Sequence, residues 1–133
     1  MLFQCDVGHM PLDDVLLMAH DTTAATSDVW DFAVELAHGT WAHHDEMDKI
    51  IVQYASGWTL DRMANVDRNV MRLALYEIVY RPDIPASVSI NEAVELAKEF
   101  STADSGRFVN GILGNMVRDH AILEQASETD AAN

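Results

Sequence analysis

Three helical patterns follow one another in residues 67–115, which read DRNVMRLALYEIVYRPDIPASVSINEAVELAKEFSTADSGRFVNGILGN. Apolar residues recur there every three or four positions, the period of one face of an α-helix. Pro82 and Pro85 separate the first pattern from the second, because a proline removes a backbone N–H donor and ends a helix. Short connections between amphipathic helices are typical of a compact helical bundle.

The first of these helices is expected to run from Asn65 or Asp67 to Arg81. Its apolar residues cover more than one face, which is typical of a central, buried helix. Glu77 lies among them, where a carboxylate needs a hydrogen-bond partner. We interpret Glu77 as a structural polar tie, with Arg72, Asn91 and nearby helix amides as candidate partners.

The second and third helices each carry one apolar stripe. The second covers residues 88–100, and the third is expected to be capped by Asp104 or Ser105. The stripe residues are Ile90, Ala93, Val94, Ala97 and Phe100 in the second helix, and Phe108, Val109, Ile112, Leu113, Met116 and Val117 in the third.

Upstream of residue 67 the helical signals are more widely spaced. The expected elements are the end of a helix at Met1–Asp6, a short helix at Pro11–His20, one long helix from Ser27 or Asp28 to Tyr54, bent at Gly39, and a connector at Ser56–Asn65 with a turn near Leu60–Met63. The only apolar–polar alternation, Ala86–Asn91, is short and has no partner strand, so no sheet is expected.

The formal charge of the chain is −14, from 22 acidic and 8 basic residues. Its distribution is uneven, since residues 1–57 carry −9, residues 58–123 carry −2 and residues 124–133 carry −3. Nucleic-acid-binding domains usually have a basic surface, so this acidity indicates either solubility alone or a basic protein partner. We expect a single domain, 1–123, and a disordered acidic tail, 124–133.

Cys5 is the single cysteine, which excludes an internal disulfide and suits a reducing compartment. The apolar runs are far shorter than a membrane span, and no signal-peptide pattern opens the chain. The sequence therefore predicts a cytoplasmic protein without a membrane contact.

No catalytic, cofactor or metal signature is present. Five potential metal ligands lie close in sequence, namely His38, His43, His44, Asp45 and Asp48. Only His44 and Asp48 have the i, i+4 spacing that places two ligands on one helix face. We interpret this region as a solvated polar face and expect no metal and no cofactor.

The segment Asp104–Asn110 combines a helix start, a cation and an aromatic ring. A helix N-terminus favours phosphate, Arg107 adds positive charge, and Phe108 has a ring on which a base can stack. By spacing alone, a core position for Phe108 and a solvated position for Arg107 explain the pattern better.

Residues 67–115 resemble the C-terminal signature of the NusB family. The matching motifs are Arg72 with Tyr76-Glu77, then Ile84-Pro85, Ile90-Asn91-Glu92-Ala93, Glu95-Leu96-Ala97-Lys98 and Phe108-Val109-Asn110-Gly111. The preceding Gly57–Arg62 and the opening Leu2–Asp6 fit the same family. The resemblance covers nearly the whole chain and is strongest after Trp58.

The resemblance implies an all-α fold of two helical subbundles, with about six to seven helices. It implies a transcription antitermination factor without catalysis, which binds boxA-type RNA together with NusE, a basic small ribosomal-subunit protein, in the transcription elongation complex. By motif position it implies RNA-binding roles for Phe3, Arg107, Phe108 and Asn110, and partner-facing rim charges at Asp61, Asp67 and Asp104.

One feature departs from the family, whose members begin with an arginine-rich first helix. The sequence opens on the last turns of that helix, and Met1–Asp6 has no capping residue before its apolar side chains. We therefore expect the native protein to carry further upstream residues, several of them arginines. Without them the bundle is expected to expose an apolar groove.

Two other functions stay open at this point. The same kind of helical domain stands at the front of RNA cytosine methyltransferases, so the chain is alternatively such a domain without its catalytic half. A third reading is a protein-docking module that binds NusE without binding RNA.

Overall fold

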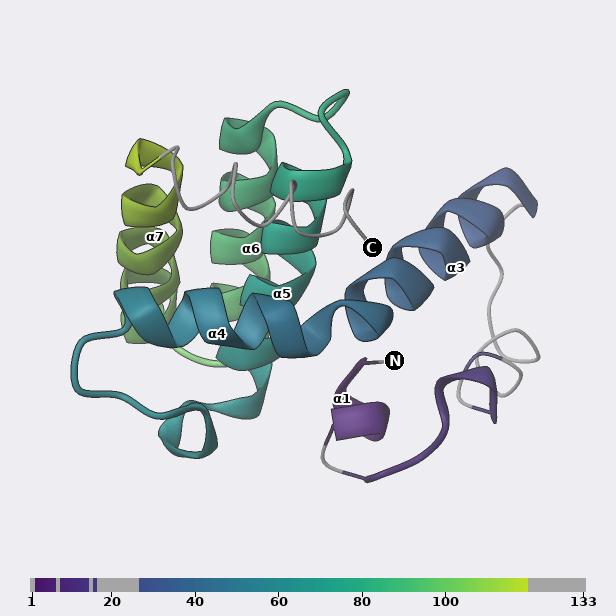
Figure 1. Ribbon diagram of the computed structural model, residues 1–133, viewed down its shortest axis with the longest axis horizontal. Coiled ribbons are helices and arrows are strands. Elements are labelled where there is room, and N and C mark those ends of the chain that lie inside the picture. The colour runs from purple at the N-terminus through teal and green to yellow at the C-terminus, as the bar shows by residue number, and fades with distance from the viewer. Residues whose placement is uncertain (1, 7, 15, 17–26, 120–133) are drawn as a thin grey trace.

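The structure, a computed structural model, describes residues 2–6, 8–14, 16 and 27–119. Every regular element in these residues is helical, as Figure 1 shows. The elements are α1 (Leu2–Asp6), α3 (Ser27–Ala42), α4 (His44–Tyr54), a 3₁₀ turn η1 (Leu60–Arg62), α5 (Asn65–Tyr80), α6 (Ala86–Phe100) and α7 (Ala103–Arg118). The all-α prediction is confirmed.

Helix α5 occupies the centre of the fold, as its apolar pattern predicts. It contacts α1, α3, α4, α6 and α7. In Figure 1, α5, α6 and α7 lie side by side, α4 crosses them, and α3 continues away from α4. The buried residues of α5 also include four polar ones, Asp67, Arg68, Asn69 and Arg72. The helix therefore contributes buried charges as well as apolar packing.

Two apolar clusters hold the helices together, in agreement with the two subbundles that the family resemblance implies. The larger contains residues of α4, α5, α6 and α7, and its largest fully buried side chains are Met47, Ile51, Met71, Leu75, Leu113 and Met116. The smaller contains Cys5, Leu12, Leu16 and Ala37, with Met10, Trp30, Val34 and Trp41 packed against them. Each fully buried large side chain contributes about 1.5–3 kcal/mol.

The prediction of one long helix up to Tyr54 is wrong, because α3 ends at Ala42 and α4 begins at His44. The interruption is slight, since the amide of His43 still bonds to the carbonyl of Gly39 at 3.1 Å. Gly39 is not the break. A Cβ atom at Gly39 would overlap the ring of Tyr76 on α5, so this glycine permits close packing of α3 on α5.

Two helix starts and the burial of one residue also differ from the prediction. Helix α6 begins two residues early, at Ala86, directly after Pro85, whose fixed φ suits a helix start. Helix α7 is capped by the Thr102 side chain, which accepts from the amide of Ser105 at 3.1 Å, and not by a residue inside the helix. Phe100 is 65% exposed and is not a core residue.

The expected short helix at residues 11–20 is helical at 12–14 and 16 but not at Pro11, and residues 15 and 17–20 lie outside the described residues. The expected acidic tail, 124–133, lies outside them as well. An apolar hollow of about 480 Å³ lies beside Leu2, between α1, α3, α5 and α6, with Phe100 at one side. None of the described helices is both long enough and apolar enough to span a bilayer.

Candidate functional site

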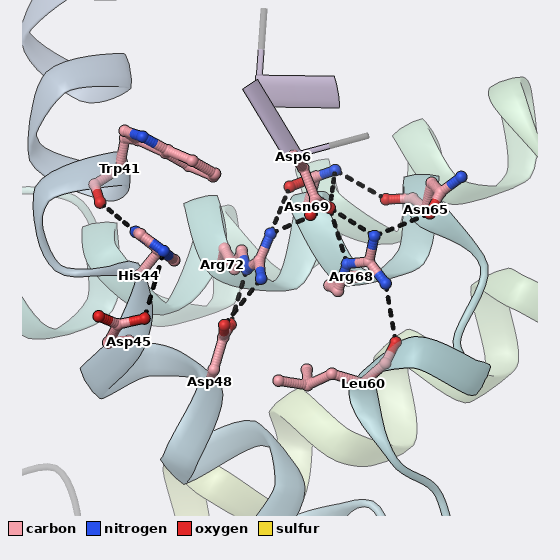
Figure 2. Close-up of polar contacts among 10 residues, drawn as sticks. All are labelled: Asp6, Trp41, His44, Asp45, Asp48, Leu60, Asn65, Arg68, Asn69 and Arg72. Atoms are coloured by element: carbon pink, nitrogen blue, oxygen red, sulfur yellow. Dashed lines mark hydrogen bonds and ion pairs between the residues drawn. The ribbon is translucent and has the colours of Figure 1, made fainter. Parts of the chain in front are cut away.

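A buried network of charged side chains fixes the first half of α5 (Figure 2). Arg72 donates two hydrogen bonds to Asp48 of α4, from Nε to Oδ1 at 2.6 Å and from Nη2 to Oδ2 at 2.7 Å. Arg68, one turn earlier, donates to Asp6 of α1 at 2.7 Å and to the carbonyl of Leu60 at 2.8 Å. The network ties α1, α4 and η1 to the central helix.

The charges in this network are well compensated. Burial lowers the pKa of the Arg72 guanidinium, but Asp48 and Asp6 outweigh burial and raise it above its ordinary value. Asn69 accepts from Arg72 at 3.0 Å and donates to Asp6 at 3.1 Å. The indole of Trp41 lies 5.8 Å from the guanidinium carbon. Because every buried charge has a partner of opposite sign, the network orders this end of α5 rigidly.

Glu77 is a structural tie, as predicted, but with a partner that the sequence did not indicate. Its Oε2 accepts from the hydroxyl of Ser89 on α6 at 2.7 Å. Ser89 is 1% exposed, so the bond joins α5 and α6 inside the bundle. Asn91, one of the predicted partners, is exposed.

A hollow of about 350 Å³ opens where the connector before α5 meets the start of α7. We call it the α7 hollow, and its lining includes Trp58, Arg62, Asp67, Asp104, Ser105 and Phe108. The connector reaches it through a tight turn in which the amide of Trp58 bonds to the carbonyl of Ala55 at 2.8 Å. Gly57 in this turn has φ +78°, a conformation that favours glycine.

Asp67 lies in the first turn of α5 and is 5% exposed. Its Oδ1 atom is buried without a hydrogen-bond partner. Burial raises the pKa of Asp67, and a hydrogen bond with the Ser105 side chain opposes this in part. A buried acceptor without a partner in the protein is uncommon and calls for an explanation; Thr40, Glu46 and Tyr54 each have one such atom as well.

Two aromatic rings form the more apolar part of the α7 hollow. Trp58 and Phe108 meet edge to face, with ring centroids 5.8 Å apart and an interplanar angle of 63°. Trp58 is 46% exposed, which is unusual for so large an apolar side chain. The guanidinium carbon of Arg62 lies 5.7 Å from the centre of the Trp58 ring, a cation–π distance.

The start of α7 forms the polar part of the hollow. Ser101 and Ser105 share a hydrogen bond of 2.9 Å between their hydroxyl groups, beside the Thr102 cap. On the solvent side, Asp104 and Arg107 form an exposed ion pair one turn apart. The positive end of the α7 dipole lies here, together with a hydroxyl cluster and one arginine that reaches solvent.

The structure brings three predicted site residues together, since Asp67, Asp104 and Phe108 all line the α7 hollow. Arg107 adjoins them through its ion pair with Asp104. Residues assigned separately to RNA and to a protein partner thus share one place. Asp67 is not an exposed rim charge, because packing against the start of α7 buries it. Its role in binding a protein partner stays a prediction.

The other predicted site residues lie apart from the hollow. Asp61 is exposed in η1, where a hydrogen bond with the Thr59 side chain lowers its pKa. Asn110 is exposed on α7 outside the hollow lining. Phe3 belongs to α1, and its side chain lies outside the described part of the structure.

Sequence reasoning missed six of the residues that line the hollow, namely Trp58, Arg62, Met63, Ala64, Thr102 and Ser105. The sequence does carry a signal for Trp58. This large aromatic residue follows a glycine in a connector without helical period, so no core position was predicted for it. Ser105 was considered only as a helix cap, and its proximity to Asp67 depends on how α7 packs on α5.

The histidine-rich region is a solvated face only in part, because His38 and Asp45 are exposed but His43, His44 and Asp48 are partly buried. The His43 ring stacks on Tyr80 at 4.5 Å, and the His44 ring stacks on Trp41 at 4.1 Å. Asp48 is occupied by Arg72. Within the described ranges, no three His, Cys, Asp or Glu side chains converge as a metal site.

The comparisons with known proteins agree with this architecture. The model of the NusB family matches residues 1–118. The chain is 48% identical over 127 residues to the transcription antitermination protein NusB of Symbiobacterium thermophilum, covering 88% of this chain and 82% of that protein. It is 49% identical over 117 residues to the protein of the same name from Desulforamulus reducens, with the same shares covered.

Solved structures give the same result. T. maritima NusB superposes with a TM-score of 0.78 at 34% identity, covering 88% of this chain and 82% of that one. A chain from the crystal structure of antitermination factors NusB and NusE in complex with dsRNA shares the fold, with a TM-score of 0.75 at 23% identity, covering 93% of this chain and 88% of that one.

The fold and the site define an all-helical protein of two subbundles, with a hollow lined by aromatic and charged side chains at the start of its last helix. The chain belongs to the NusB family.

Proposed function

We propose that this protein is a transcription antitermination factor that binds boxA-type RNA together with NusE, in the transcription elongation complex of the bacterial cytoplasm. The observation that carries the proposal is the α7 hollow, where Phe108, Asp67 and Asp104 meet beside Arg107. These are the residues to which the family resemblance gives binding roles. The names of the relatives support the same function.

The charges near the hollow suit a joint surface for RNA and protein. Arg107 and the start of α7 offer positive potential to phosphate, whereas exposed Asp61 offers negative charge to a basic partner. The net charge of −14 opposes RNA binding by the chain alone. A basic partner that neutralises part of this charge increases RNA affinity, so the proposal includes cooperation between NusE and RNA.

The test is a titration of fluorescent boxA RNA with the 133-residue chain, with and without NusE, at several salt concentrations. We expect NusE to increase the affinity, and the logarithm of the binding constant to fall linearly with the logarithm of salt concentration. RNA binding that NusE does not change contradicts the cooperative function. NusE binding without any RNA binding assigns the chain to protein docking alone.

A matched pair of variants locates the RNA surface. Arg107→Ala removes the arginine at the start of α7, whereas Arg118→Ala removes an exposed arginine at its other end. Both keep the helix, and both change the net charge equally. We expect only Arg107→Ala to weaken RNA binding in the presence of NusE. Equal loss in both variants indicates a general charge effect and not a site at the hollow.

A further inference from the structure

We propose that the α7 hollow seats one unstacked base of single-stranded RNA, and that Asp67 reads its Watson–Crick edge, with a preference for guanine. The inference rests on the proposed RNA-binding function and deepens it. It also reassigns Asp67 from the protein-binding side to the RNA side. The argument depends on four features of the hollow, which are its free acceptor, its aromatic rings, its charge balance and its helix start.

The free acceptor is Oδ1 of Asp67, a residue that is 5% exposed and lines the hollow. An ionised carboxylate accepts hydrogen bonds but donates none. Removing it from water without a partner costs free energy, which a bound N–H donor recovers. The hollow therefore favours a ligand that carries an N–H group on its leading edge.

The aromatic rings favour a flat ligand. Trp58 and Phe108 meet edge to face, and the large exposed share of Trp58 leaves ring surface for stacking. Bases of single-stranded RNA are recognised in proteins by stacking on aromatic rings together with hydrogen bonds to their Watson–Crick edges. Phe108 and Asp67 line the same hollow, so one base can meet both.

The charge balance favours a neutral ligand over a lysine or arginine from a protein. Arg62 already lies over the Trp58 ring, and Arg107 already pairs with Asp104. A cation from a partner would bind the Trp58 ring or Asp104, but each of these already has an arginine of this chain beside it. Two arginines against two aspartates leave no excess negative charge at the hollow.

The helix start accounts for the rest of the nucleotide. The first turn of α7 lies beside the hollow, and its dipole together with Arg107 attracts a phosphate. The free acceptor of Asp67 is independent evidence for a ligand at the same place. One nucleotide can therefore bind with its base in the hollow and its phosphate at the start of α7.

The edges of the bases decide the preference. Guanine presents two adjacent donors, N1–H and the 2-amino group, which match an acceptor-only carboxylate. Uracil presents one N–H between two carbonyl oxygens, which repel a carboxylate. Adenine and cytosine each present an amino group beside an acceptor nitrogen. Guanine is therefore the base that Asp67 accepts best.

The experiment uses the 133-residue chain with ¹⁵N label and follows the indole N–H signal of Trp58, assigned with Trp58→Phe. The probes are the 5′-monophosphates of guanosine, inosine and uridine, titrated separately. Inosine lacks only the 2-amino group of guanosine. We expect the guanosine nucleotide to bind about tenfold more tightly than the uridine nucleotide. The inosine nucleotide should lose most of this advantage.

Two variants separate the role of Asp67 from a general effect. Asp67→Asn replaces one acceptor by a donor and should abolish the difference between the guanosine and inosine nucleotides, while the Trp58 signal still responds. Asp61→Asn removes an exposed acid outside the hollow and should leave the difference unchanged. If Asp67→Asn does not fold, the affinities of the unaltered chain for the three nucleotides still test the preference for guanine.

Equal affinity for all three nucleotides, or no response of Trp58 to any of them, overturns the proposal. So does a Trp58 response to arginine amide without a response to the guanosine nucleotide, which assigns the hollow to a basic protein side chain. The boxA titration is separate. If RNA and NusE bind while the nucleotides show no preference, only base reading by Asp67 fails and the proposed function stands.

Discussion

Replacing Arg72 by methionine is expected to destabilise the protein by about 3–5 kcal/mol, because it leaves a buried carboxylate without its cation. The Arg72 and Asp48 side chains are 5% and 13% exposed. Asp48 would lose both of its hydrogen bonds to Arg72. Asp6 would lose less, since Arg68 lies 2.6 Å from it. Methionine keeps apolar contact with Trp41, so the loss reports mainly on charge.

This loss is a large share of a total stability of about 5–15 kcal/mol. For a domain of this size it corresponds to a fall in melting temperature of roughly 10–20 °C. Urea unfolding followed by tryptophan fluorescence gives the free energy of unfolding directly. Circular dichroism at low temperature, without urea, shows whether the variant is folded at the start of the experiment.

Arg81→Met is the matched control. Arg81 lies 2.5 Å from Glu35 and 3.1 Å from Asp83, but these acids are 57% and 63% exposed. An exposed ion pair contributes about 0–1 kcal/mol. If Arg72→Met costs no more than Arg81→Met, the network does not hold the helices together as argued. The double variant Arg72→Met with Asp48→Leu should recover at least half of the loss, because no unpaired charge remains at Asp48.

Three further outcomes are expected. Asp67→Asn should raise the melting temperature near neutral pH. The pKa of Asp67 is raised in the folded state, so its charged form is disfavoured there and the unaltered protein loses stability as pH rises. The gain from the substitution should therefore shrink as pH falls toward 3.8, the ordinary pKa of an aspartate. A gain that is equal at all pH values would contradict this. Arg107→Ala should reduce the salt slope of RNA binding by about 1, measured with NusE present; an unchanged slope removes Arg107 from the phosphate contacts. Asp61→Lys should slow NusE association at low salt, seen by stopped-flow mixing, with little effect at high salt; an identical rate at low salt shows that Asp61 is not at that interface.

Much of the fold was predictable because it depends on local periodicity. The stretch from Asp67 to Asn115 has proline breaks and regular apolar spacing, and the helices formed there with boundaries changed by one or two residues. Phe100 continued an apolar stripe in sequence yet lies 65% exposed at the last residue of α6. Periodicity specifies a face, but only packing determines whether another helix covers its end.

The candidate site likewise contains residues that the sequence could place and residues that only the packing of the helices brings together. The family motif placed Arg107 and Phe108 at a helix start, because both belong to one continuous segment. It could not place Trp58 beside Phe108, since these residues are far apart in the chain and meet only when α7 packs against the connector. Arg72 was a candidate partner of Glu77, but Glu77 binds Ser89. Arg72 instead pairs with Asp48 and Asp6, which lie on two other helices.

The sequence by itself determined that this chain is all-helical, that α5 is central, and which family it belongs to, because these properties depend on helical period and on motifs within short segments. Only the tertiary structure decided which acids are buried. Asp61 and Asp67 have equal charge and similar sequence surroundings, yet one is exposed and the other is 5% exposed. The difference arises because the start of α7 covers the first turn of α5, a contact between distant segments that no local pattern encodes.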